Sequence, residues 1–398
     1  MKDTKKPKIR FKEFNDSWEQ RKLSDMAIFN PKAELPDVFE YVDLESVVGT
    51  EMLSHRTESK RTAPSRAQRL AQKGDLFYQT VRPYQKNNYL FENPEKHYVF
   101  STGYAQMRPI VDGRFLLCLV QNDGFVKDVL DNCTGTSYPA INSNDLAEIE
   151  VYSPSDPQEQ RQIGDFFKKI DSLITLHQRE CEKLLCFKKS MLEKMFPKNG
   201  EKYPEIRFSG FTDSWEQRKL GSIADRVTEK NALLEVSETF TNSAEFGIIS
   251  QRDFFDHDIT NKENIGNYFI VRPEDFVYNP RISVTAPVGP INRNKLGRNG
   301  VMSPLYTVFR PHDVSNTYLE YFFKTSRWYA FMQFNGDSGA RSDRFSIGTD
   351  LFYEMPIPAP SFNEQEKIGS FFANLSDLIT LHQREIKVQK RIKLWRII

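Results

Sequence analysis

The feature that most constrains this chain is a long internal repeat. The segment PKIRFKEFNDSWEQRKLSDMA at residues 7–27 returns as PEIRFSGFTDSWEQRKLGSIA at residues 204–224. A second segment, EQRQIGDFFKKIDSLITLHQRE at residues 159–180, returns as EQEKIGSFFANLSDLITLHQRE at residues 364–385. Each half therefore opens with one shared phrase and closes with another, which indicates two tandem units of similar fold.

The interiors of the two halves diverge but keep a sparse common frame. GDLFY at residues 74–78 corresponds to EDFVY at 274–278, and STGYAQMRP at 101–109 corresponds to SPLYTVFRP at 303–311. The interiors are rich in β-branched and aromatic residues interrupted by Pro, Gly and Asn, which favours strands and hairpins. Short helices are expected around residues 314–334. We therefore expect two α+β domains of similar fold that carry different surfaces.

The closing segments predict long amphipathic helices. After Pro154 and Pro157, residues 158–195 contain no Pro and place apolar residues three, four and seven apart, and the copy after Pro358 and Pro360 does the same. A helix of ~35 residues is ~50 Å long at ~1.5 Å per residue, so its apolar stripe needs a partner. We expect the two helices to pair as an antiparallel coiled coil.

The predicted fold class is α+β, with two tandem α+β domains that are separated and joined by two long helices. These helices form an antiparallel coiled coil, and the whole is pseudo-two-fold symmetric. The repeat boundaries predict six segments: an N-terminal repeated segment (1–23), a first variable domain (24–153), a central repeated region with a long helix (154–203), a second copy of the N-terminal segment (204–220), a second variable domain (221–359) and a C-terminal repeated long helix (360–398).

Composition narrows the class of protein. The 398 residues are 39% hydrophobic, and 55 Lys and Arg against 54 Asp and Glu give a net charge of +1, so a globally basic nucleic-acid binder is not indicated. The four cysteines form no CxxC pair, which favours free thiols in a reducing compartment. The sequence shows no signal peptide and no apolar run long enough to span a bilayer. We expect a cytoplasmic protein without membrane association.

Motifs for catalysis and cofactor binding are missing from the sequence. It contains no GxxxxGK[ST], GxGxxG, GxSxG or HExxH. The six histidines are scattered, and the matching pair His177 and His382 is interpreted as a helix-seam or partner contact because the whole helix is repeated. We expect neither a catalytic residue nor a metal ligand in this chain.

Local charge is more informative than net charge. Basic residues cluster with Tyr, Asn and Gln in the non-repeated interior of each half, where Arg and Lys could neutralise phosphates and Arg, Asn or Gln could read base edges. A solvated basic face is the alternative for either cluster. The candidate DNA contacts are Arg56, Lys60, Arg61, Arg66, Arg69, Arg82, Tyr84, Lys86, Asn87, Asn88, Arg281, Asn292, Arg293, Asn294, Lys295, Arg298, Asn299, Arg341 and Arg344.

Two divergent domains, each followed by a near-identical long helix, resemble the specificity subunit of type I restriction-modification systems. SWEQRKLSDMA and SWEQRKLGSIA stand ahead of the variable domains. Behind them stand SPSDPQEQRQIGDFFKKIDSLI and PAPSFNEQEKIGSFFANLSDLI, in which Pro, Glu-Gln and Ile-Gly keep the family's spacing. The resemblance covers nearly the whole chain.

The resemblance implies that each variable domain is a target-recognition domain that reads one half of a bipartite double-stranded DNA sequence, with the paired helices setting the spacing. It also implies that the repeated helical segments dock two adenine methyltransferase subunits, which use S-adenosylmethionine, and that separate restriction subunits cut DNA with ATP and Mg2+. No cofactor is then expected on this chain. Candidate docking or coiled-coil residues are Trp18, Ile163, Phe167, Ile170, Leu173, His177, Trp215, Ile368, Phe372, Leu375, Leu378 and His382.

The repeat itself agrees with such an assembly. Two equal docking surfaces need two equal sequences, whereas domains that face different half-sites are free to differ. Two other hypotheses stay open at this point. One is a non-catalytic protein–protein scaffold without DNA readout, and the other is a self-contained DNA-modifying enzyme, which would need a cofactor loop or metal ligands.

Overall fold

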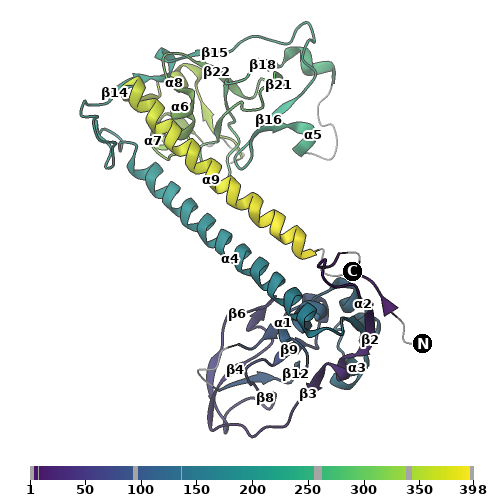
Figure 1. Cartoon of the computed structure of the whole chain (residues 1–398). Helices are drawn as coiled ribbons and strands as arrows, with labels where there is room; N and C mark the ends of the chain where they lie inside the picture. The colour runs from purple at the N-terminus through teal and green to yellow at the C-terminus, as the bar shows by residue number, and fades with distance from the viewer. Residues whose placement is uncertain are drawn as a thin grey trace. The chain divides into compact units, whose positions relative to one another are not determined.

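The computed structural model describes residues 4–7, 9–92, 97–135, 137–254, 262–337 and 343–394. The chain divides into two compact units, which we call unit 1 (Met1–Gln178 and Arg384–Ile398) and unit 2 (Arg179–Gln383) (Figure 1). Each unit contains sheets and short helices, and the long helices α4 (Pro157–Lys194) and α9 (Phe362–Leu394) run through both. The α+β class is confirmed, whereas the six segment boundaries stay a prediction.

Unit 1 is built on two four-stranded sheets. One is antiparallel, in the order β10 (Tyr89–Leu90), β9 (Leu76–Gln79), β12 (Tyr104–Pro109) and β3 (Ala27–Phe29). The other is mixed, in the order β7 (Arg56–Ser59), β4 (Val38–Val42), β11 (Tyr98–Ser101) and β8 (Ala67–Leu70). Around them lie β1 (Thr4–Lys5), β2 (Trp18–Lys22), β13 (Glu150–Ser153), the hairpin β5 (Val47–Val48) and β6 (Glu51–Met52), and the helices η1 (Leu23–Asp25), η2 (Pro83–Gln85), α1 (Gly113–Val120), α2 (Asp123–Asp131) and α3 (Ser143–Glu148).

Unit 2 repeats the first of these sheets. Its antiparallel sheet has the order β15 (Ala224–Arg226), β22 (Thr307–Pro311), β19 (Phe276–Tyr278) and β20 (Ile291–Arg293), which matches β3, β12, β9 and β10. Four two-stranded pairs surround this sheet in the described structure. They are β14 (Glu216–Lys219) with β25 (Pro356–Ala359), β16 (Phe240–Ser243) with β17 (Gly247–Ser250), β18 (Phe269–Val271) with β21 (Gly300–Met302), and β23 (Gly336–Asp337) with β24 (Ser346–Ile347). The helices are η3 (Leu220–Ser222), α5 (Gln251–Phe254), η4 (Lys262–Asn267), α6 (Asn316–Phe322), α7 (Tyr329–Asn335) and α8 (Thr349–Tyr353).

The opening repeated strand of each half pairs with the strand that leads into the long helix of the same half. In unit 1, β2 runs antiparallel to β13, the strand just before α4. In unit 2, β14 runs antiparallel to β25, the strand just before α9. The repeated phrase SWEQRKL therefore forms the same strand in both units, against a strand that leads into the same helix.

A buried ion pair fastens each opening segment to its long helix. Arg10 donates two hydrogen bonds to Glu159, at 2.6 and 2.7 Å, and Arg207 donates two to Glu364, both at 2.7 Å. Both carboxylates are buried. A bidentate guanidinium–carboxylate pair fixes geometry as well as charge, so these repeated residues hold each unit together.

A buried ion pair also accounts for the few residues that the two interiors share. The Asp75 carboxylate accepts two hydrogen bonds from Arg108, at 2.9 and 3.0 Å, and Asp275 accepts two from Arg310, at 2.7 and 2.9 Å. Both carboxylates are buried at the start of matching strands, β9 and β19. An unpaired charge there would be costly, which explains why Asp and Arg recur in otherwise divergent interiors.

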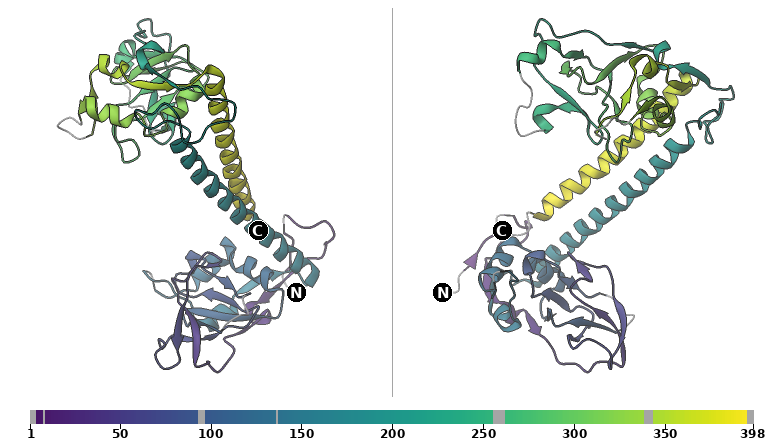
Figure 2. Two further views of the ribbon diagram at one scale, coloured as in Figure 1. Left: turned by 90° about the vertical axis from the view of Figure 1, so that its left-hand side faces the viewer. Right: turned by 180° about the vertical axis from the view of Figure 1, so that it is seen from behind.

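The two long helices pair in the antiparallel sense. Within unit 2, the ribbons of α4 and α9 run side by side (Figures 1 and 2). There Cys181 and Leu184 of α4 pack against Leu375 and Ile379 of α9, and further along α4 the Lys188 Nζ donates to Ser376 Oγ at 2.6 Å. Within unit 1, an ion pair joins Asp171 of α4 to Lys393 near the end of α9. Because contacts that advance along α4 retreat along α9, the predicted antiparallel pairing is confirmed.

Candidate nucleic-acid interface

Each unit carries a loop directly after an inner strand of its repeated sheet. The β9–β10 loop comprises residues 80–88 and the β19–β20 loop comprises residues 279–290. The strands that bear them are repeated, but the loop sequences are not. Loops on a rigid scaffold are where binding residues concentrate, so these two loops are the natural place for different specificities.

The β9–β10 loop is held in a strained conformation. Arg82 and Lys86 have φ values of 53° and 56°, in the left-handed region that few side chains adopt. The Arg82 N–H donates to the Pro139 carbonyl at 2.8 Å, and the Lys86 Nζ donates to the Gln121 carbonyl at 3.0 Å. Since such a backbone persists only where its surroundings impose it, the loop presents the exposed ring of Tyr84 at a fixed position.

The β19–β20 loop is anchored at its base as well. Gly289 has a φ of 84°, and a Cβ there would lie 2.1 Å from the Asn279 carbonyl oxygen, so only glycine fits. Ser283 and Ala286 exchange backbone hydrogen bonds of 3.0 and 3.1 Å near the tip. Val284 between them is 102% exposed. Both loops thus combine a fixed base with an exposed apolar or aromatic tip.

Unit 1, which carries the β9–β10 loop, also has basic side chains for which the described structure shows no acidic partner. Lys60, Arg61 and Arg66 are exposed and Arg69 of β8 is half-buried, and no ion pair reaches these four in the part of the chain that the structure describes. Burial lowers the pKa of Arg69. Arg82 stacks on the Tyr138 ring at 4.5 Å. These positive charges are available to phosphates.

In unit 2 the backbone brings two of the candidate arginines together. Arg281 of the β19–β20 loop forms an isolated β-bridge with Arg344, and both are exposed. No acidic partner is found for either within the described ranges. Arg341 lies outside the described residues. The two arginines form the positive edge of the second loop.

Five other candidate cations are already neutralised by carboxylates of their own unit. Each of these five adds little net charge, and Arg293, whose side chain is 10% exposed, cannot reach a phosphate while it stays paired. The pairs are Arg56 with Asp43 and Glu58, Lys86 with Asp123, Arg293 and Lys295 with Glu320, and Arg298 with Glu238.

Most of the candidate asparagines serve the fold. Asn88 and Asn294 are buried, the first accepting from the Gln79 N–H at 2.8 Å and the second donating to backbone carbonyls. Asn87 accepts from the Gly49 N–H and Asn292 donates to Asn242, at 2.8 and 2.7 Å. We no longer propose these four as base contacts, because at least one amide atom of each is hydrogen-bonded within the protein. Asn299 is exposed.

The candidate docking residues separate into buried and exposed groups. Trp18 and Trp215 lie in the cores of their own units, so we no longer propose them as docking residues. Also buried in these cores are Ile163, Phe167, Ile170, Ile368 and Phe372, and Leu375 lies in the helix seam. His177 and His382 are half-buried at matching positions of the two helices.

Exposed leucines recur at matching positions of α4 and α9. Leu173 and Leu378 are 40% and 41% exposed, and Leu176 and Leu381 are both 52% exposed. The last two were not among the predicted docking residues, although the repeated phrase LITLHQRE contains them. Equal exposure of equal residues is what two identical partners would require.

Within the described ranges, no group of three or more His, Cys, Asp and Glu is placed to hold a metal ion. In the same ranges, no helix combines the length and low polarity that crossing a membrane requires.

Comparison with known proteins agrees with this architecture. Residues 15–185 match the family described as the type I restriction modification DNA specificity domain. The chain is 27% identical over 144 residues to the type I restriction enzyme HindI specificity subunit of Haemophilus influenzae, and the match spans about a third of each protein, 34% of this chain and 31% of that one.

Two solved structures share the fold over nearly the whole chain. The type I restriction-modification S subunit from M. genitalium has a TM-score of 0.53 with 14% identity and covers 98% of each chain. A chain from a study of complex assembly and conformational transition in the type I R-M system has a TM-score of 0.52 with 19% identity and covers 95% of each. These matches confirm the resemblance of this chain to type I restriction-modification specificity subunits, and residues 15–185 match the model of their DNA specificity domain.

Proposed function

We propose that this chain is the DNA-reading subunit of a type I restriction-modification complex, and that each unit reads one half of a bipartite double-stranded target. The observation that carries this proposal is how repeated and unrepeated residues are distributed. Repeated residues hold the fold, through pairs such as Arg207 with Glu364, or are exposed on the long helices. Unrepeated residues form the two anchored loops and the cations of the same units that have no acidic partner in the described structure.

The proposed DNA contacts follow from exposure and free charge. In unit 1 they are Lys60, Arg61, Arg66, Arg69, Arg82 and Tyr84, and in unit 2 they are Arg281, Asn299 and Arg344. The positive charges attract phosphates, and the loop tips supply contacts to base edges or between bases. We propose 24–153 and 221–359 as the recognition domains, with α4 and α9 as the spacer between half-sites.

The exposed leucines support docking of two adenine methyltransferase subunits. Leu173 and Leu176 would receive one copy, and Leu378 and Leu381 the other, with restriction subunits joining through them. The proposal assigns S-adenosylmethionine, ATP and Mg2+ to those partners and gives this chain no catalytic role. All four cysteines are free thiols, which supports a cytoplasmic location.

Methylation mapping tests DNA reading directly. The chain is co-expressed with its methyltransferase, and modified adenines are located by sequencing. We expect a bipartite motif with an unspecified gap. Replacing both Arg281 and Arg344 with Gln should relax one half of that motif and leave the other half unchanged.

A matched control removes a neutralised arginine from the same unit. Arg298 is exposed but donates two hydrogen bonds of 2.7 Å to Glu238, so Arg298→Gln should leave the motif intact. A pure scaffold predicts no motif at all and no effect of either variant. Equal affinity for every duplex at moderate salt would also contradict the proposal.

A further inference from the structure

Unit 2 contains a cavity of about 450 Å3 beside the β19–β20 loop. The tip of the β16–β17 hairpin, the loop itself, β20, α6 and the start of α7 line it. Its volume falls within the roughly 300–1,000 Å3 of small-molecule sites. The sheet and loop that bear it are the ones that we assign to DNA recognition, but nothing in that assignment requires a cavity.

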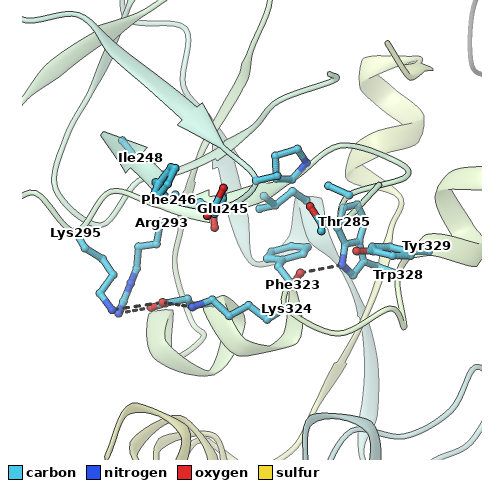
Figure 3. A pocket seen from close by; sticks show the side chains of 17 residues that line it. Glu245, Phe246, Ile248, Thr285, Arg293, Lys295, Phe323, Lys324, Trp328 and Tyr329 are labelled. Carbon is cyan, nitrogen blue, oxygen red and sulfur yellow. Dashed lines mark hydrogen bonds and ion pairs between the residues drawn. The ribbon is translucent and has the colours of Figure 1, made fainter. Parts of the chain in front are cut away.

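One side of the cavity is cationic. Arg293, Lys295 and Lys324 converge on the buried carboxylate of Glu320, with N to O distances of 2.6, 3.4 and 3.0 Å (Figure 3). A single buried carboxylate thus faces three cations, and among the described residues only Arg293 has a second acidic partner, the exposed Glu274. Within the described structure, no acceptor reaches the buried Nε of Arg293.

The positive potential extends behind this wall. Lys188 of α4 lies 5.4 Å from the centre of the Tyr321 ring, and Lys324 lies 5.0 Å from the same ring. Burial first, and then the charge of Lys324, lower the pKa of Lys188 to about 8. Crowding of like charges is stabilised by an anion, and a phosphate carries enough charge to fill that role.

The remaining walls are aromatic and polar. Phe323, Trp328 and Tyr329 line one side, and Phe246 at the hairpin tip, 60% exposed, lines another (Figure 3). Glu245 lines the cavity beside Phe246, and its carboxylate could accept from an exocyclic amino group. Aromatic faces combined with a carboxylate acceptor suit a nucleobase.

We propose that this cavity binds a nucleotide, with its phosphate on Lys295 and Lys324 and its base against the aromatic walls. Both lysines are partly exposed, so they can turn to a phosphate while Arg293, 2.6 Å from Glu320, keeps that buried carboxylate paired. A phosphate alone would use only one side of the cavity. The nucleotide could be free in solution or unstacked from bound DNA, and the latter source rests on the function proposed above.

Calorimetric titration of the full chain with deoxynucleoside monophosphates and with inorganic phosphate tests the site. Because base stacking on aromatic side chains is worth ~1–3 kcal/mol, we expect at least one nucleotide to bind about tenfold or more tightly than phosphate. Equal affinity for inorganic phosphate, or no nucleotide binding up to millimolar concentration, would overturn the proposal.

Variants locate the binding. Lys324→Gln should weaken nucleotide binding about tenfold, and Phe246→Ala should weaken nucleotide binding without changing phosphate binding. Lys230→Gln removes one exposed charge of the same unit outside the cavity lining and should change neither. An equal effect of Lys230→Gln and Lys324→Gln would mean general electrostatic attraction, and would contradict a built site.

Competition identifies the source of the nucleotide. Displacement of the mononucleotide by target DNA would assign the cavity to an unstacked nucleotide of that DNA. Simultaneous binding would assign it to a free nucleotide. The titrations contain no DNA, so their result stands even if the chain proves not to recognise a DNA sequence. Conversely, the mapped methylation motif stands even if the cavity proves not to bind a nucleotide.

Discussion

The repeated ion pairs Arg10–Glu159 and Arg207–Glu364 allow two matched substitutions to be compared. Arg207→Met and Arg10→Met each remove the guanidinium from a carboxylate that is only 1% exposed, while the arginines themselves are 15% and 13% exposed. Breaking a buried pair by removing one partner costs roughly 3–5 kcal/mol. Because both arginines keep some contact with water, we take the lower limit, about 3 kcal/mol, for Arg207→Met.

The two variants should nevertheless differ. Trp18 Nε1 donates to Glu159 at 3.2 Å, whereas no acceptor is found for Trp215 Nε1 in the described part of the chain. Glu159 therefore keeps one hydrogen bond after Arg10→Met, and Glu364 keeps none of this kind after Arg207→Met. A hydrogen bond to a charged group is worth at least about 1 kcal/mol even when it is 3.2 Å long, so Arg10→Met should cost about 2 kcal/mol or less.

Hydrogen exchange under increasing urea, followed by mass spectrometry, measures the loss in free energy of unfolding for each unit separately. Equal losses for the two variants, or a loss below about 1 kcal/mol, would refute the reasoning.

Three further predictions concern single residues. Gly289→Ala should lower the free energy of unfolding by at least ~3 kcal/mol, measured by heat or urea, because its Cβ would lie 2.1 Å from a backbone oxygen. The control Gly297→Ala has a φ of 69° but open space around it, so it should cost only the ~1 kcal/mol of backbone strain. Equal costs for the two variants would contradict this account. Since the pKa of Lys188 is lowered to about 8, the unfolded chain binds more protons between about pH 8 and 10.5, so stability should rise with pH across that window. The gain is about 1 kcal/mol after allowance for solvent screening, and Lys188→Met should abolish it. Lys60→Gln should reduce the slope of log affinity for target DNA against log salt by about 1 if Lys60 contacts a phosphate, and an unchanged slope would remove Lys60 from the interface.

The helices show how much local pattern can predict. The apolar periodicity and the flanking prolines predicted a helix over residues 158–195, and α4 spans Pro157–Lys194. The sequence also predicted short helices around 314–334, where α6 and α7 lie. These predictions are confirmed because helix formation and termination depend on neighbours within a few residues.

The charged sites show where such reasoning stops. Arg298 and Arg344 look alike in sequence, yet the first is neutralised by Glu238 and the second has no acidic partner in the described structure. Glu238 lies far from Arg298 along the chain and reaches it only through the fold. The same holds for Asn294, whose amide lies buried against backbone carbonyls.

The repeat, read by itself, determined that the chain holds two similar α+β units with two long helices, because identical sequences fold alike and periodicity is local. Only the tertiary structure decided what the repeated residues do. It buried Trp18, Trp215, Glu159 and Glu364 inside the units and left the leucines of α4 and α9 exposed. Burial and charge neutralisation are set by residues distant in sequence, so no local pattern reveals which repeated residues pack inside a unit and which stay exposed.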